Sequence, residues 1–328
     1  MKPTPGGAGS PGSAGLSRRR SLLGGVRRPR PTLWLAAAVA SLGSALAVFA
    51  AEASWQPTTW RGEEALQSTH GPWRAVVSIE RSRLVVFGRA DSAENLLYES
   101  ATRDDPAGWG GHRLWLGPQV KWAKIWPPPE AWEHSRPESV TVDGGTLWLV
   151  LRDPGDGWPR LTRTYRWGGF GLICGAEFHG GTRPAQFIQI VQIPASDLGQ
   201  ALARPDQVAP QGYVRLPAGE VQALTTAFMP PPQVSRERDV LQLRHIGRAE
   251  KLGFRPQTLF ALRAGVKVLS VARADLKGTV VGEPDAGFPT MVFIGGREPF
   301  IELEQLSPLF AAGGDALFEI EVTAGPER

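Results

Sequence analysis

The run Phe-Ile-Gln-Ile-Val-Gln-Ile at residues 187–193 decides the fold. Successive side chains of a strand point to opposite faces, so Phe187 and Val191 lie on one face, and Ile188 and Ile190 lie on the other. Both faces are partly apolar, which is typical of a strand that is covered on both sides. We therefore expect this strand to lie between two layers of protein.

Similar runs recur at short spacing on both sides of this strand. Strands are predicted at 74–79, 83–88, 95–99, 112–116, 138–142, 146–152, 161–167, 171–178, 240–246, 257–263, 266–272, 290–294, 299–305 and 316–322. Asp143-Gly144-Gly145 predicts a hairpin turn between two of them. Helical patterns occur only at 196–204 and 218–227, and both are short. Many strands and few helices indicate an all-β sandwich or barrel over residues 54–328.

A separate leader precedes this β region. Residues 1–31 are rich in Gly, Ser, Pro and Arg and are predicted to be disordered. Residues 32–51 hold no charged side chain, so we expect a helix at 32–53 that serves either as a signal peptide or as a membrane anchor. The protein is therefore expected to be exported to the periplasm or beyond, either released or held at the inner membrane.

The charge distribution argues against nucleic acid as a partner. The whole chain has a formal net charge of +4, but residues 1–53 hold seven basic residues and one acidic residue. The remaining 275 residues hold 29 basic and 31 acidic side chains. A nearly neutral body offers no electrostatic attraction for a polyanion.

Tryptophan is concentrated in the first half of the β region. Eleven of the twelve tryptophans lie between Trp55 and Trp167, and Trp115 and Trp126 fall in the densest part. They either pack in the core or line a groove on which the apolar faces of sugars stack. A neutral polyhydroxylated ligand is the sharper hypothesis.

Acidic and imidazole side chains suggest a candidate site. Glu302 and Glu304 lie two apart on a predicted strand, so both carboxylates point to one face, where they either line a cleft or face solvent. His112 follows two glycines that allow close approach of a ligand. With one cysteine and no two histidines at metal-ligand spacing, neither a metal nor a cofactor is expected.

Three segments carry a family resemblance. Asn95-Leu96-Leu97-Tyr98-Glu99, the stretch from Gly110 to Pro118, and Trp126-Pro127-Pro128-Pro129 look like an uncharacterised bacterial family, domain of unknown function 4380. The stretch from Phe300 to Leu309 resembles the C-terminal end of the same family. That family is similar to the galactose mutarotase-like superfamily, so the resemblance implies a large antiparallel β-supersandwich.

The resemblance also implies residue roles. In mutarotases a glutamate near the C-terminus acts as general base on the anomeric hydroxyl, and a histidine protonates the ring oxygen. Glu302 or Glu304 would be the base, and His112 or His179 the acid. Arg113 would contact a substrate hydroxyl or an anion. Apart from the resemblance, the tryptophan-rich segment makes Trp115 and Trp126 candidate ligand contacts, and His179 is a further candidate.

Three functions follow as hypotheses. The first is an exported carbohydrate-binding protein without turnover. The second is a sugar epimerase, similar to aldose 1-epimerase, which requires Glu304 or Glu302 and His112 to reach one cleft. The third is a membrane-tethered envelope module that binds another protein.

Overall fold

The molecule is described by a computed structural model, which covers the β region with several gaps. It describes residues 54–100, 110–124, 127–195, 213–217, 221–223, 234–237, 240–243, 245–254, 260–264, 267–296 and 298–325. Residues 52–328 form one compact unit. In the described part no helix is long and apolar enough to cross a membrane. The predicted leader and apolar helix, together with the predicted helix at 196–204, lie outside the described residues.

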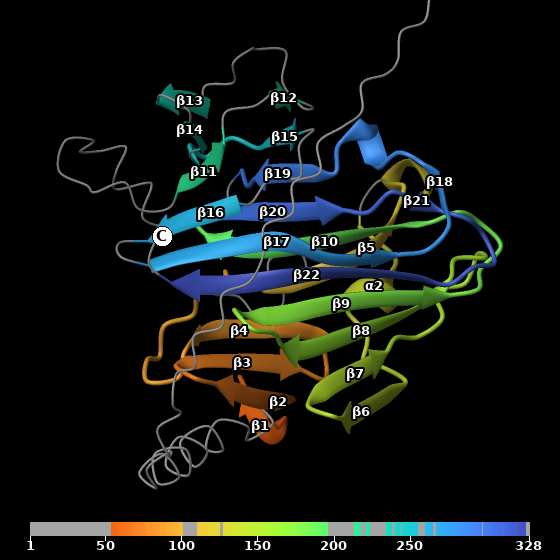
Figure 1. Ribbon diagram of the computed structural model, residues 1–328, viewed down its shortest axis with the longest axis horizontal. Coiled ribbons are helices and arrows are strands. Elements are labelled where there is room, and N and C mark those ends of the chain that lie inside the picture. The colour runs from red at the N-terminus through yellow and green to blue at the C-terminus, as the bar shows by residue number, and fades with distance from the viewer. Residues whose placement is uncertain are drawn as a thin grey trace, which may run out of the picture. The chain divides into compact units, whose positions relative to one another are not determined.

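The largest element is an antiparallel ten-stranded sheet (Figure 1). In spatial order its strands are β13 (Val234–Glu237), β14 (Val240–Leu243), β11 (Tyr213–Pro217), β16 (Phe260–Ala264), β17 (Lys267–Lys277), β22 (Ala316–Gly325), β9 (Leu172–His179), β8 (Arg160–Trp167), β7 (Thr146–Val150) and β6 (Ser139–Asp143). β6 and β7 meet at Gly144 and Gly145, whose φ values of 52° and 74° fit the predicted hairpin turn.

Three smaller antiparallel sheets complete the β structure. The six-stranded sheet has the order β12 (Val221–Ala223), β15 (Glu250–Phe254), β19 (Thr290–Ile294), β20 (Phe300–Leu306), β10 (Gln186–Pro194) and β5 (His112–Gly117). The four-stranded sheet runs β1 (Gln56–Trp60), β2 (Glu63–His70), β3 (Trp73–Ser78) and β4 (Arg83–Arg89), and the two-stranded sheet pairs β18 (Val280–Gly282) with β21 (Leu309–Phe310). Among the described residues the helical segments are short: η2 (Gln119–Lys121), α2 (Glu130–Glu133) and η3 (Asp285–Gly287).

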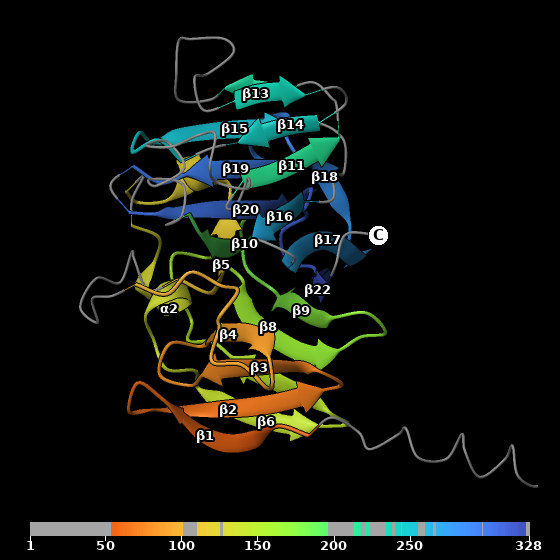
Figure 2. The same cartoon turned by 90° about the vertical axis from the view of Figure 1, so that its left-hand side faces the viewer.

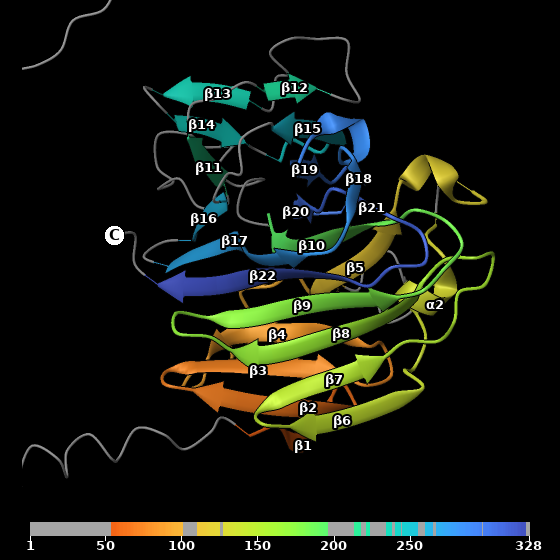
Figure 3. The same cartoon turned by 45° about the vertical axis from the view of Figure 1, so that its right-hand side comes forward.

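The ten-stranded sheet packs against both the four-stranded sheet and the six-stranded sheet (Figures 2 and 3). Toward the four-stranded sheet, the amide of Leu84 donates to the hydroxyl of Tyr165 over 3.2 Å. Toward the six-stranded sheet, the rings of Phe187 and Phe318 stack with their centroids 6.2 Å apart. One apolar core runs through all three sheets. The predicted all-β sandwich is therefore confirmed.

The strand β10 confirms the opening prediction. Eight of its nine residues, Gln186 to Ile193, are buried, and it is hydrogen-bonded to β5 on one side and to β20 on the other. A strand that is covered on both faces and paired along both edges needs apolar side chains at successive positions, because these point to opposite faces. Pairing with β10 therefore sets the register of β5 and β20.

Two predicted elements are wrong. Residues 221–223 of the predicted helix at 218–227 form β12, which pairs with β15, so sheet pairing overrides the local helical pattern. Residues 95–99 are not a strand, because their amides bond to different partners: Leu96 to Phe87 of β4, and Tyr98 to Gln192 of β10. This segment therefore links the four-stranded and six-stranded sheets.

Candidate functional site

The register of three strands gathers polar side chains on one face of the six-stranded sheet. Ile190 of β10 lies opposite Arg113 of β5 and, on its other side, opposite Glu304 of β20. Gln192 lies opposite Glu302 in the same register. Residues that are paired across strands point to the same face, so these four polar side chains lie together.

Lys251 of β15 joins this group. It lies opposite Phe293 of β19, which lies opposite Glu302. Its Nζ donates to Oε2 of Glu304 over 2.8 Å. We call Arg113, Gln192, Lys251, Glu302 and Glu304 the outer-face cluster, because the other face of the sheet packs on the ten-stranded sheet.

Glu302 is the group in this cluster that is suited to proton exchange. Its Oε1 accepts from Nε2 of Gln192 over 2.8 Å and from Nη1 of Arg113 over 3.3 Å. Burial raises the pKa of Glu302 to about 7, against the opposing effect of Arg113. Glu302 therefore exists in both protonation states near neutral pH.

Lys251 remains charged beside Glu304. Burial disfavours the ammonium, but the carboxylate of Glu304 raises the pKa of Lys251 above its ordinary value. The Lys251 side chain is 23% exposed, against 1% for Glu304 and 7% for Glu302. Solvent therefore reaches the cluster from the side of β15.

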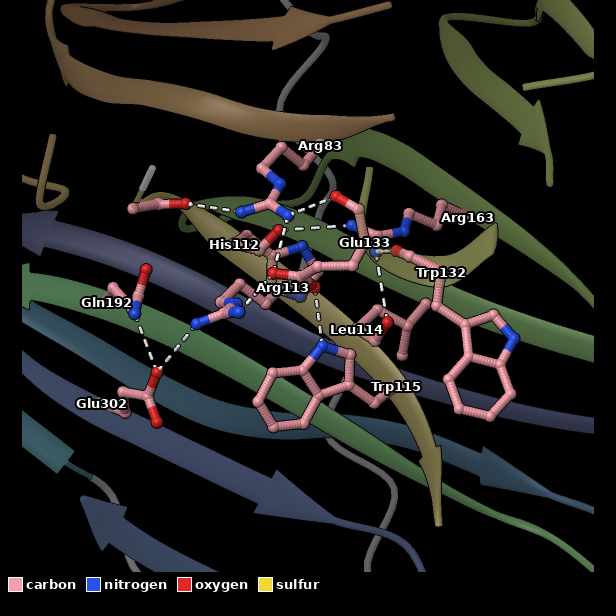
Figure 4. Close-up of polar contacts among 11 residues, drawn as sticks. Arg83, His112, Arg113, Leu114, Trp115, Trp132, Glu133, Arg163, Gln192 and Glu302 are labelled. Carbon is pink, nitrogen blue, oxygen red and sulfur yellow. Dashed lines mark hydrogen bonds and ion pairs between the residues drawn. The ribbon is translucent and has the colours of Figure 1, made fainter. Parts of the chain in front are cut away.

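Arg113 is also held from its other side (Figure 4). Its guanidinium forms an ion pair with Glu133 at the end of α2, and Arg83 of β4 pairs with the same Oε1 over 2.9 Å. Nε1 of Trp115 donates to Oε2 of Glu133 over 2.7 Å. Burial alone would raise the pKa of Glu133, but the two arginines hold it well below its usual range. Glu133 is therefore ionised under ordinary conditions.

Two buried acceptors of the cluster have no hydrogen-bond partner among the described residues. They are Oε1 of Gln192 and Oε1 of Glu304. Both side chains are fully buried. A buried acceptor without a partner costs about 1–3 kcal/mol, so a ligand hydroxyl that donated to it would recover that energy.

The structure places His112 away from the glutamates. His112 precedes Arg113 on β5, so it points to the opposite face. Its Nε2 donates to Oε1 of Gln189 over 2.9 Å, and its Nδ1 lies 3.3 Å from the hydroxyl of Tyr165. Burial, with the nearby Arg163, lowers the pKa of His112 to about 3. His112 is a neutral core residue and does not reach one cleft with Glu302 or Glu304.

The glycines before His112 serve the backbone. Gly110 and Gly111 both have φ of 78°, and a Cβ on Gly110 would lie 1.7 Å from the carbonyl oxygen of Tyr98. A Cβ on Gly111 would lie 2.2 Å from the carbonyl oxygen of Leu84. The close approach that was expected for a ligand is made by the protein's own chain.

Trp115 lies in the core. It is 4% exposed, and its ring starts a buried series in which Trp115, Trp122, Trp132 and Trp158 follow one another with centroids 5.2–6.2 Å apart. The core-packing interpretation therefore holds for these four rings, and they do not line an open groove. Trp126 lies outside the described residues.

His179 lies in a different sheet from the outer-face cluster. It ends β9 in the ten-stranded sheet, its side chain is more than half exposed, and its Nδ1 lies 3.0 Å from Asp315. Glu302 and Glu304 do point to one face, as predicted, with Ile301, Leu303 and Gln305 on the other. That face is buried, so the solvated alternative is wrong. Among the described residues no group of three or more His, Cys, Asp or Glu could hold a metal ion.

Sequence reasoning missed Arg83, Glu133, Gln192 and Lys251. A polar residue inside a buried apolar strand is a usable signal, and Gln192 in the run at 187–193 provides one. Glu133 has no such signal, since it lies in a four-residue helix after three prolines. Its importance depends on partners from β4 and β5, which are distant in sequence.

Comparisons with known proteins identify the fold. No protein-family model matches the chain, and no curated protein does. Solved structures do match. A galactose mutarotase-like protein from Lactobacillus casei ATCC 334 superimposes with a TM-score of 0.52 and 12% identity, over 79% of this chain and 99% of its own.

Two further structures agree. A candidate aldose 1-epimerase from Escherichia coli K12 has a TM-score of 0.54 and 11% identity, over 80% of this chain and 99% of its own. A candidate mutarotase from Salmonella typhimurium has a TM-score of 0.53 and 10% identity, over 84% of this chain and 94% of its own. The chain has the galactose mutarotase-like β-sandwich fold, as the resemblance implied. At these identities the likeness defines the fold alone.

Proposed function

We propose that the protein is an exported carbohydrate-binding protein, related to the domain of unknown function 4380 family, which binds a neutral polyhydroxylated ligand at the outer-face cluster. The observation that carries the proposal is the pair of buried acceptors, Oε1 of Gln192 and Oε1 of Glu304, which have no partner among the described residues. Sugar hydroxyls supply the donors that these two atoms lack. Mutarotase-like neighbours with the same fold support a sugar ligand.

The charges of the cluster fit a neutral ligand. Arg113 and Lys251 already have carboxylate partners in Glu302 and Glu304. An anionic ligand would have to displace one of these carboxylates or lie beside it, at a cost in repulsion. Hydroxyl groups can bond to the same groups without displacing a charge.

Export is part of this proposal and rests on the sequence. Residues 32–51 are apolar and follow a basic segment, which is the pattern of a signal peptide or an anchor. Fractionation of cells that express the full chain tests it. Recovery of the protein in the cytoplasm with its leader intact would contradict export.

Calorimetric titration with neutral hexoses and short glycans tests the binding. The full chain is expected to bind at least one of them at millimolar concentration or better. Gln192→Leu removes one acceptor and is expected to weaken binding about tenfold to hundredfold. Gln67→Leu, a matched change on the half-buried strand β2 of another sheet, is the control and should bind normally. If no sugar binds to the unaltered protein, the proposal fails.

Sugar epimerisation is the second candidate, and the pKa of Glu302, about 7, favours it because a base with that pKa accepts a proton near neutral pH. The acid is the difficulty. His112 faces the core, and the ammonium of Lys251 is a poor proton donor because Glu304 raises its pKa. Binding without turnover is therefore the better-supported function. Polarimetry of freshly dissolved sugars decides between the two: a rate enhancement that Glu302→Gln abolishes would establish the epimerase.

A further inference from the structure

Glu133 and Glu302 share one guanidinium, and they share it unequally. Arg113 forms its ion pair with Glu133 through Nη2, while Nη1 lies 3.3 Å from Oε1 of Glu302. Glu133 also holds Arg83 and accepts from Trp115, and its side chain is completely buried. Glu302 has Gln192 as its other hydrogen-bond partner. The stronger set of contacts is therefore on the side of Glu133.

The contacts around Glu133 hold Arg113 in position. Its guanidinium lies 4.8 Å from the centroid of the Trp115 ring, whose Nε1 is bonded to Glu133. Arg83 reaches Glu133 twice, through the carboxylate at 2.9 Å and through the backbone oxygen at 2.6 Å. The carboxylate of Glu133 thus has little freedom to move, and Arg113 is anchored to it.

We propose that Glu133 is a positioning residue, which holds Arg113 so that Glu302 receives only a single, long contact from it. A guanidinium that pairs bidentately with a carboxylate favours the charged form strongly. Glu302 has no such bidentate pair with Arg113, because only Nη1 of Arg113 contacts it. Glu302 therefore takes up a proton close to neutral pH, accepting from a ligand hydroxyl when ionised and donating to a ligand oxygen when protonated.

Other groups that face Glu302 do not replace this effect. Among the described residues they are Glu304 on the same strand, Lys251 on β15 and the neutral Gln192 on β10. Lys251 is bonded to Glu304, so the charges of these two largely cancel at Glu302. The contact with Arg113 is the one that a change at Glu133 would alter.

The inference concerns the site of the proposed function and rests on it only for the identity of the ligand, so its test uses the ligand-free full chain. The carboxyl carbon of Glu302 is followed by NMR through a pH titration and is assigned by its disappearance in Glu302→Gln. In Glu133→Gln the guanidinium of Arg113 is released toward Glu302. The titration midpoint of Glu302 should then fall by about 1–2 pH units.

A second variant predicts the opposite shift. Arg83→Met removes the other cation from Glu133, which should then draw Arg113 closer and raise the midpoint of Glu302. A purely structural role for Glu133 would change stability but leave the midpoint in place in whichever variant folds. An unchanged midpoint in a folded Glu133→Gln or Arg83→Met protein, or shifts of the same sign in both, would overturn the proposal. These outcomes do not depend on whether a sugar binds.

Discussion

The two faces of the six-stranded sheet place neighbouring residues in different surroundings. On β5, His112 and Arg113 are neighbours, yet His112 points to the core and Arg113 points to the outer-face cluster. Burial holds His112 neutral, with a pKa of about 3, while burial raises the pKa of Glu302 on the other face to about 7. A shift of register by one residue would exchange these environments. The register therefore decides which side chains face the core and which join the outer-face cluster.

The partners of each face explain the difference. His112 is bonded to Gln189, whose Nε2 donates to the carbonyl oxygen of Phe318 over 2.7 Å, so both the oxygen and the nitrogen of the Gln189 amide have partners. On the outer face Gln192 and Glu304 each keep one acceptor without a partner among the described residues. A satisfied network stabilises a core, whereas a buried acceptor without a partner carries a cost that a donor on the proposed ligand would offset.

The largest expected effect is a loss of folding stability in acid, caused by His112 on the inner face. The pKa of His112 is lowered in the folded protein, so only the unfolded chain takes up its proton as the pH falls from 6.5 toward 3. His112 therefore stabilises the fold above pH 6.5, and this contribution, of order 4–5 kcal/mol, is lost between pH 6.5 and 3. Urea unfolding across this range should show a steeper loss in the unaltered protein than in His112→Gln. Parallel curves would mean that His112 is solvated and not held in the core.

The next effect has the opposite sign and belongs to the outer face. The folded pKa of Glu302 is raised to about 7, from an ordinary value of 4.5, so the folded protein binds the proton more tightly than the unfolded chain. This contribution is present below pH 4.5 and is lost as the pH rises through 7. It amounts to about 3–4 kcal/mol. Stability measured from pH 5 to 8 should fall less in Glu302→Gln. An equal fall in both proteins would show that Glu302 is ionised throughout this range.

The sequence predicted one face of this sheet better than the other. The alternation in 187–193 and 299–305 was enough to place strands there and to put Glu302 and Glu304 on one face, because side-chain parity is a local property. The pairing of β10 with β5 on one side and with β20 on the other is not local. It alone decides that Arg113, rather than His112, lies beside Glu302.

The second limit was burial. Acidic side chains at alternate positions are compatible with a solvent-exposed face and with a buried cleft. Only the presence of basic partners distinguishes the two, because buried carboxylates require them. Those counter-charges are Lys251 on β15 and Arg113 on β5, which is also paired with Glu133 of α2. No pattern within residues 299–305 indicates them.

The smallest expected effect is that of a change at Gln192, which is compared with a change at Gln189 on the same strand. Gln189→Leu removes the partner of His112 and of the Phe318 carbonyl oxygen, which leaves two buried polar groups unsatisfied, and should destabilise the fold by about 2–4 kcal/mol. Gln192→Leu removes one donor to Glu302 but also removes an acceptor that had no described partner. Its cost in stability should therefore be below about 1 kcal/mol, although it weakens sugar binding. Thermal unfolding of both variants measures this difference. Equal destabilisation would mean that Gln192 stabilises the fold as much as Gln189 does. Gln192 would then be a structural residue, which would contradict its proposed role in ligand binding.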